Sequence, residues 1–172
     1  EWLGCVLNSE DNVGIDGWVN SYQETSNLQK ELEKKQIHLT LTPDPFNELW
    51  TDRPALPDNK VFIHELKYAG LSCKDKITQI QEASCTGILI SALDEVAWTL
   101  NLRGSDVHCN PVFVSYLLIT EYSSTLYIIE NKLSDEVKDY LAENGVTVKP
   151  YSTIEKDLKD FTGKLLLSAS IN

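Results

Sequence analysis

The chain has 172 residues, and 15 Lys and Arg against 26 Asp and Glu give it a formal net charge of −11. Hydrophobic residues make up 42% and charged residues 24%, which is ordinary for a folded domain and too apolar for a disordered chain. The sequence has no cluster of Lys and Arg and no apolar run near the ~20 residues of a membrane span. Neither a nucleic acid nor a membrane is therefore an expected partner.

The first 41 residues predict a strand, a helix and a second strand. Residues 12–17 (NVGIDG) predict a short apolar strand that ends in glycine. Residues 21–35 predict an amphipathic helix, because Leu28 and Leu32 lie four apart and share one face. Residues 37–41 (IHLTL) alternate as a strand with one solvated face does.

A proline-rich segment follows at residues 42–59. It holds four of the six prolines, at positions 43, 45, 54 and 57. Proline lacks an N–H and blocks helix formation, so this composition is typical of a linker. We expect a domain boundary here, with residues 1–56 in one domain and 57–172 in another.

Strands and helices are predicted to alternate after the linker. The strands are expected at 60–66, 86–92, 111–120, 124–130, 146–149 and 164–169. The helices are expected at 72–85, 94–102, 134–143 and 152–161, with Ser72 and Ser134 as N-caps. This alternation predicts an α/β fold with a mostly parallel sheet flanked by helices, and the short turn between 111–120 and 124–130 makes the sheet mixed through one antiparallel hairpin.

The residue types that carry catalysis are sparse. The four cysteines (Cys5, Cys73, Cys85 and Cys109) form no C-x-x-C pair, and we expect reduced thiols of a cytosolic protein. The three histidines have no metal-ligand spacing, and no phosphate-binding or nucleophile-elbow motif is present. An independent small enzyme is therefore disfavoured.

One segment, Asn101–Asn110 (NLRGSDVHCN), concentrates polar side chains. It mixes Arg103, Asp106, His108 and Asn110 in a predicted loop between a helix and a buried strand. It is either a solvated loop with a local Arg103–Asp106 pair, worth at most about 1 kcal/mol when exposed, or a rim that faces another domain or a substrate. Chemistry alone leaves these alternatives even.

Two stretches resemble a known family: WTDRP at 50–54 and SALDEVAWTLNLRGSDVHCNPVFVSY at 91–116. They are similar to the Xaa-Pro aminopeptidases (aminopeptidase P) of the three-domain type. Weaker similarity extends through VGIDG at 13–17, ELKYAGLSCKDKI at 65–77 and VKPYSTI at 148–154. Between Lys76 and Ile88 the predicted helix and its turn are about one helical turn shorter than in relatives.

The resemblance implies two creatinase-like N-terminal domains and a C-terminal catalytic domain with a dinuclear metal site, usually manganese. That site is built from two Asp, one His and two Glu, none of which has a counterpart here, so the resemblance implies no cofactor in this chain. Such enzymes remove an N-terminal residue that precedes proline. The resemblance places residues 1–56 at the end of the first domain and 57–172 in the second. The absence of Met also suggests a piece of a longer protein.

By the same resemblance, the chain is non-catalytic and helps to assemble an oligomer, expected to be a cytoplasmic homodimer, and to shape the active-site cleft. Its partners would be the catalytic domain of the same polypeptide and peptides with proline second. Arg103 would meet a peptide carboxylate and His108 would line the cleft, with Asp106 and Asn110 in the same loop. The alternative is an interaction module of this family that has lost peptidase activity.

Overall fold

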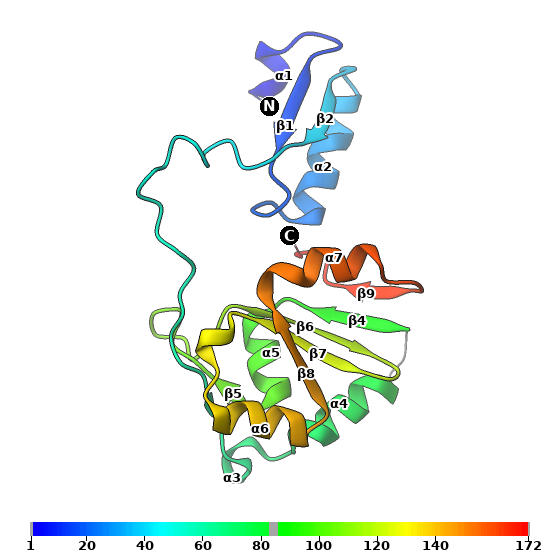
Figure 1. Cartoon of the computed structure of the whole chain (residues 1–172). Helices are drawn as coiled ribbons and strands as arrows, with labels where there is room; N and C mark the ends of the chain where they lie inside the picture. The colour runs from blue at the N-terminus through cyan, green and yellow to red at the C-terminus, as the bar shows by residue number, and fades with distance from the viewer. Residues whose placement is uncertain (1, 83–85, 172) are drawn as a thin grey trace. The chain divides into compact units, whose positions relative to one another are not determined.

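A computed structural model of the chain describes residues 2–82 and 86–171 (Figure 1). These residues divide into two compact units, one of residues 1–55 with 169–172 and one of residues 56–168. The division falls inside the proline-rich segment 42–59, where no helix or strand forms. The three residues 83–85, which include Cys85 and the end of the predicted helix 72–85, lie outside the described part, and so does the middle of the segment between Lys76 and Ile88 that is predicted to be shortened.

The first unit contains the predicted strand, helix and strand. β1 (Asn12–Ile15) pairs in parallel with β2 (His38–Leu41), and α2 (Tyr22–Glu33) connects them. α2 begins with a capping box, in which the Ser21 hydroxyl accepts from the Glu24 N–H and the Glu24 carboxylate accepts from the Ser21 N–H. A short helix that the sequence did not predict, α1 (Leu3–Val6), precedes β1.

The second unit is built on a five-stranded sheet in the order β8-β7-β6-β4-β9. These strands are β4 (Gly87–Ile90), β6 (Ser115–Thr120), β7 (Ser124–Ile128), β8 (Val146–Pro150) and β9 (Leu165–Leu167). The predicted mixed sheet is confirmed, but it is not mostly parallel. β7 with β8 and β4 with β9 are parallel, whereas β6 is antiparallel to both its neighbours. The hairpin lies in the middle of the sheet, where it contributes two antiparallel pairings rather than one.

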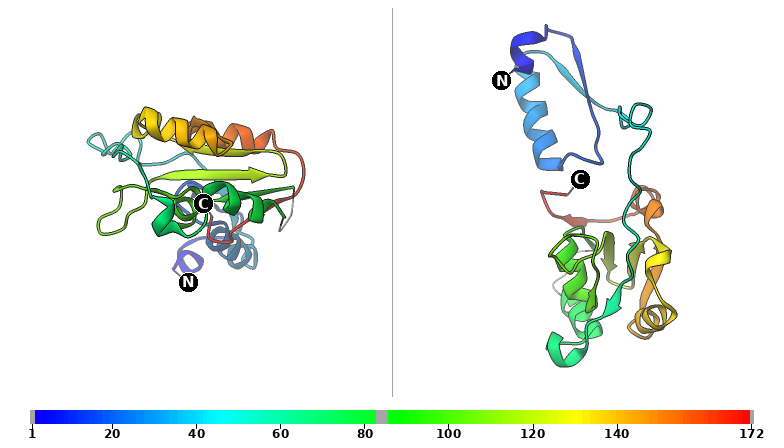
Figure 2. Two further views of the ribbon diagram at one scale, coloured as in Figure 1. Left: turned by 90° about the horizontal axis from the view of Figure 1, so that it is seen from below. Right: turned by 90° about the vertical axis from the view of Figure 1, so that its left-hand side faces the viewer.

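Helices cover both faces of this sheet. α4 (Cys73–Glu82), α5 (Leu93–Leu100) and α6 (Asp135–Glu143) lie on one face, where their buried side chains share one core cluster. α7 (Ile154–Lys159) lies on the other face, where its Asp157 accepts from the Tyr127 hydroxyl of β7 (Figure 1, Figure 2). The 3-10 turns η1 (Glu130–Lys132) and η2 (Tyr151–Thr153) join β7 to α6 and β8 to α7. The two central strands β6 and β7 are buried almost throughout, and they form the floor of the core.

Two predicted strands are shorter in the structure. Of residues 60–66 only β3 (Phe62–Ile63) is a strand, and it pairs with β5 (Leu102–Arg103) outside the main sheet before α3 (Leu66–Ala69) begins. Residues 111–114 do not join β6. The carbonyls of Pro111 and Val112 accept instead from the N–H groups of Gly104 and Asp106, so this segment is bound to the preceding loop.

None of the helices in the described ranges is long and apolar enough to cross a membrane.

Substitution of Leu100, the last residue of α5, tests how much the packing of the core stabilises the second unit. Leu100 is fully buried in the core cluster of the second unit. Leu100→Ala should lower the free energy of unfolding of this unit by about 2–5 kcal/mol, because the cavity is left unfilled. Denaturant unfolding measures the change. Leu66→Ala, at an exposed position, is the matched control and should cost well under half as much; equal losses would contradict the assigned core.

Candidate functional site

The C-terminal end of α5 gathers the polar side chains of the candidate site. The helix ends at Asn101, which takes the left-handed conformation with φ 50° and ψ 42°. Its last carbonyls accept from three side chains: Arg103 Nη1 donates to the Ala97 oxygen at 2.7 Å, Lys76 Nζ to the Trp98 oxygen at 2.7 Å and the Tyr140 hydroxyl to the Leu100 oxygen at 3.1 Å. Cations here also complement the negative end of the helix dipole.

Lys76 on α4 is buried to 1% exposure without a carboxylate partner within ion-pair distance among the described residues. Besides the Trp98 carbonyl it donates to Asn101 Oδ1 at 2.7 Å, and its Nζ lies 4.1 Å from the centroid of the Trp98 ring. Burial, together with the nearby charge of Arg103, lowers the pKa of Lys76. Carbonyl dipoles and a π face therefore stabilise this ammonium.

Cys73 lies one helical turn before Lys76 and is equally buried. Burial raises the pKa of its thiol to about 11, although the neighbouring Lys76 acts in the opposite direction. A thiol in this state is neutral and unreactive at neutral pH. The free thiols of Cys5 and Cys109, by contrast, are exposed.

The loop that follows α5 is fixed by a buried ion pair. The carboxylate of Asp106 accepts from Lys132 Nζ of η1 and, at 2.7 Å, from the Val114 N–H, and both charged side chains are fully buried. The local Arg103–Asp106 pair is therefore not formed. Arg103 turns back to the Ala97 and Leu102 carbonyls, at 2.7 and 2.8 Å, and Asp106 turns inward to Lys132.

His108 and Asn110 lie on the exposed part of the same loop. An isolated bridge between Val107 and Asn110 closes the tip, and Cys109 takes a positive φ of 59°. The four predicted site residues are thus divided: Arg103 packs against the end of α5, Asp106 lies inside the unit, and His108 and Asn110 face solvent.

The sequence analysis did not identify Lys76 and Lys132. Lys76 binds the C-terminal end of α5, and Lys132 binds Asp106 in the loop. A signal existed for Lys76, because Cys73, Lys76, Ile77 and Ile80 follow the helical spacing of a buried face. No comparable signal marks Lys132, because its partner Asp106 is 26 residues away in the chain.

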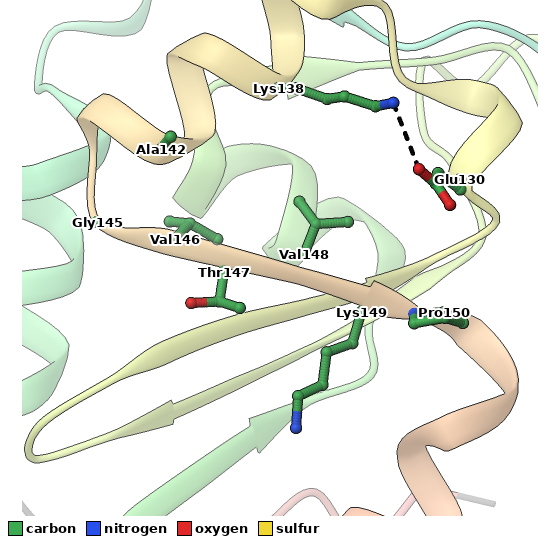
Figure 3. Close-up of a pocket in the computed structure, with 9 residues that line it drawn as sticks. All are labelled: Glu130, Lys138, Ala142, Gly145, Val146, Thr147, Val148, Lys149 and Pro150. Carbon is green, nitrogen blue, oxygen red and sulfur yellow. Dashed lines mark hydrogen bonds and ion pairs between the residues drawn. The ribbon is translucent and has the colours of Figure 1, made fainter.

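A hollow of about 570 Å³ lies along the edge strand β8 (Figure 3). It is bounded by α6 and by the strand itself, including Ala142, Val148 and Pro150. Its cations are already paired: Lys138 contacts Glu130 at 3.4 Å, and Lys149 contacts Asp157 at 2.6 Å. The unpaired edge of a strand can accept an extended peptide, so the hollow is a candidate binding surface rather than a catalytic one.

Within the described ranges, no group of three or more His, Cys, Asp or Glu side chains could hold a metal ion. The dinuclear centre implied by the family resemblance does not fit these residues.

Residues 52–172 match the family described as the creatinase/prolidase N-terminal domain, and the chain belongs to this family. Its fold is also that of a solved X-prolyl aminopeptidase from Caenorhabditis elegans, with a TM-score of 0.88 and 25% identity over 99% of this chain and 30% of that one. That protein is described as a cytosolic enzyme with a di-nuclear active site.

The chain is also similar to curated aminopeptidases. It is 39% identical over 165 residues to a probable Xaa-Pro aminopeptidase P of Ajellomyces capsulatus, covering 92% of this chain and 26% of that protein. It is 38% identical over 161 residues to aminopeptidase P2 of Arabidopsis thaliana, covering 90% of this chain and 23% of that protein. The chain thus spans about a quarter of the length of these relatives.

The buried ion pair predicts a strong coupling. Lys132→Met should lower the free energy of unfolding by about 3–5 kcal/mol, because it leaves the Asp106 carboxylate buried without its cation. The double variant with Asp106→Asn should recover more than half of this loss. Denaturant unfolding of both single variants and the double variant measures the coupling. Additive losses would show that the two charges do not depend on each other.

The thiols should differ sharply in reactivity. At pH 8, Cys5 and Cys109 should be alkylated at least about a hundred times faster than Cys73, because the latter is buried and neutral. Peptide mapping by mass spectrometry reads each site, and the denatured chain is the control in which Cys73 reacts normally. Because the raised pKa favours the neutral thiol in the folded state, its contribution to stability is lost as pH rises from 9 towards 11. Rapid labelling of Cys73 in the folded chain would contradict its burial.

Proposed function

We propose that this chain is the N-terminal, non-catalytic part of a metal-dependent Xaa-Pro aminopeptidase, which removes the residue that precedes proline. The observation that carries the proposal is the match along nearly the whole chain to proteins named Xaa-Pro aminopeptidase P, together with 99% coverage by the fold of an X-prolyl aminopeptidase. Residues 1–56 would end the first N-terminal domain and 57–172 would form most of the second.

The peptidase chemistry would come from the catalytic domain of the same polypeptide. About three quarters of the length of the relatives lies beyond the matched region, which leaves room for that domain. A dinuclear metal site there, with manganese as the metal, would polarise the scissile bond and activate water. The part played by this chain is to assemble a cytoplasmic homodimer and to shape the cleft through which peptides with proline second enter.

The loop 101–110 is the part of the chain proposed to face that cleft. Arg103 uses only Nη1 in hydrogen bonds within the described residues, so its other N–H groups can bind a peptide carboxylate. His108 and Asn110 on the exposed tip would line the cleft. Asp106 acts indirectly, since its pair with Lys132 holds the loop in place.

The first test is made on the full-length polypeptide that contains this chain. Hydrolysis of Xaa-Pro peptides that is lost on chelation and restored by manganese is the expected result. A full-length protein that leaves such peptides intact under all metal conditions would contradict the proposal.

The role of Arg103 has a kinetic signature. Arg103→Ala in the full-length enzyme should raise KM for Xaa-Pro peptides by about tenfold or more, because a hydrogen bond to a charged group is lost. Arg103→Lys should raise KM by less than Arg103→Ala does, because the lysine keeps the positive charge. Because Arg103 also caps α5, the melting temperature of each variant is measured in parallel. Unchanged KM in a folded Arg103→Ala variant would remove this residue from the cleft.

The second candidate function is an interaction module of this family without peptidase activity. The hollow beside the edge strand β8 favours it, because that surface suits an extended peptide whether or not a catalytic domain is active (Figure 3). The activity assay separates the two candidates.

A further inference from the structure

Several large apolar side chains are exposed around the end of α5 in the second unit. Five large side chains lie on β3, α3, the segment after α3 and the end of α5, and each is between 42% and 69% exposed: Phe62, Leu66, Tyr68, Leu71 and Trp98. We call this set the α5 face. Single exposed apolar residues are common on protein surfaces, but contiguous patches mark interaction sites.

Hydrogen bonds and a ring contact join the elements that carry the α5 face. The Asn101 side chain, at the end of α5, donates to the Leu71 carbonyl at 2.8 Å, and the His64 N–H donates to the Asn101 carbonyl at 2.8 Å. His64 in turn lies with its ring centroid 5.9 Å from that of Tyr68. The elements that carry the five side chains therefore meet around Asn101.

The α5 face also adjoins the proposed cleft loop. Phe62 is directly opposite Arg103 in the antiparallel pair of β3 and β5, and residues opposite each other in such a pair project to the same side. A catalytic domain whose cleft reaches Arg103 would therefore also lie beside Phe62. This step rests on the proposed function, because it takes loop 101–110 as a wall of the cleft.

We propose that the α5 face is the surface on which the catalytic domain of the same polypeptide docks. Two observations identify the occupant. The α5 face adjoins the loop proposed to line the cleft. About three quarters of the length of the relatives lies outside the matched region, and that part needs a fixed position against this chain. The surface of the catalytic domain that docks here would be apolar, to complement the aromatic and leucine side chains of the α5 face. Aromatic side chains contribute much of the binding energy in such contacts.

One member of this surface, Trp98, already has a partner within the unit before docking. Trp98 is held against the ammonium of Lys76, whose Nζ lies 4.1 Å from the ring centroid, and α5 and α4 pack in the core below it. A preformed aromatic anchor loses little side-chain freedom on binding. The α5 face is thus built to receive a partner rather than to reorganise around one.

Hydroxyl-radical footprinting tests the docking directly, because it reports the solvent exposure of individual side chains. Phe62, Tyr68 and Trp98 should be oxidised at least about fivefold more slowly in the full-length polypeptide than in the 172-residue chain. Tyr122, 88% exposed in the β6–β7 turn, is the matched control, and its oxidation should be equal in both proteins. Leu66→Asp in the full-length polypeptide should restore oxidation of Trp98 towards its rate in the 172-residue chain, whereas Tyr122→Asp should leave Trp98 protected.

The outcomes separate this proposal from the proposed function. Xaa-Pro hydrolysis with no protection of the α5 face overturns the docking and leaves the function standing. Protection without hydrolysis supports the docking and contradicts the function. Protection that already occurs in the 172-residue chain and increases with its concentration assigns the α5 face to a second copy and overturns the docking proposal.

Discussion

The end of α5 is the point on which the second unit depends. A helix leaves its last carbonyls without partners, and here Arg103, Lys76 and Tyr140 satisfy them from β5, α4 and α6. Tyr140 comes from α6, which packs on the same face of the sheet as α4 and α5, so one helix terminus connects the three helices of that face (Figure 1). Because each donor also fixes its own element, the positions of α4, β5 and the loop after β5 follow from this one terminus.

Two ammonium groups, buried on either side of that terminus, have different kinds of partner. Lys76 has only carbonyl oxygens and the Trp98 ring, whereas Lys132 has the carboxylate of Asp106. Burying an ion is costly unless it has a charge or hydrogen-bond partner, and each ammonium has at least one. Together they hold loop 101–110 to the unit at both its base and its middle. A loop fixed in this way can present His108 and Asn110 in one orientation, which suits a wall of a binding site rather than a mobile connection.

The order of elements could be predicted well from local patterns. The capped helices at Ser21, Ser72 and Ser134 and the hairpin strands all appear, because capping and hydrophobic periodicity are local. The misjudged segments are those with distant partners. Residues 60–66 have a strand-like composition, yet only Phe62 and Ile63 pair as a strand, with β5 some forty residues later. The N–H groups of Val61 and His64 on either side donate to the carbonyls of Lys132 and Asn101. Residues 111–114 were predicted to extend β6 but bond to the preceding loop instead.

The candidate site shows the same limit. The sequence by itself determined the class of fold, the position of the polar loop and, through residues 91–116, the family to which the chain belongs. It could not show that Arg103 and Asp106 separate, because Asp106 pairs instead with Lys132, which lies 26 residues away in the chain. Tertiary structure alone decided the order of strands, the burial of Lys76 and Lys132 and the gathering of five apolar side chains on one face. The physical reason is that burial and charge pairing are settled by which segments meet in space, and sequence spacing does not specify that.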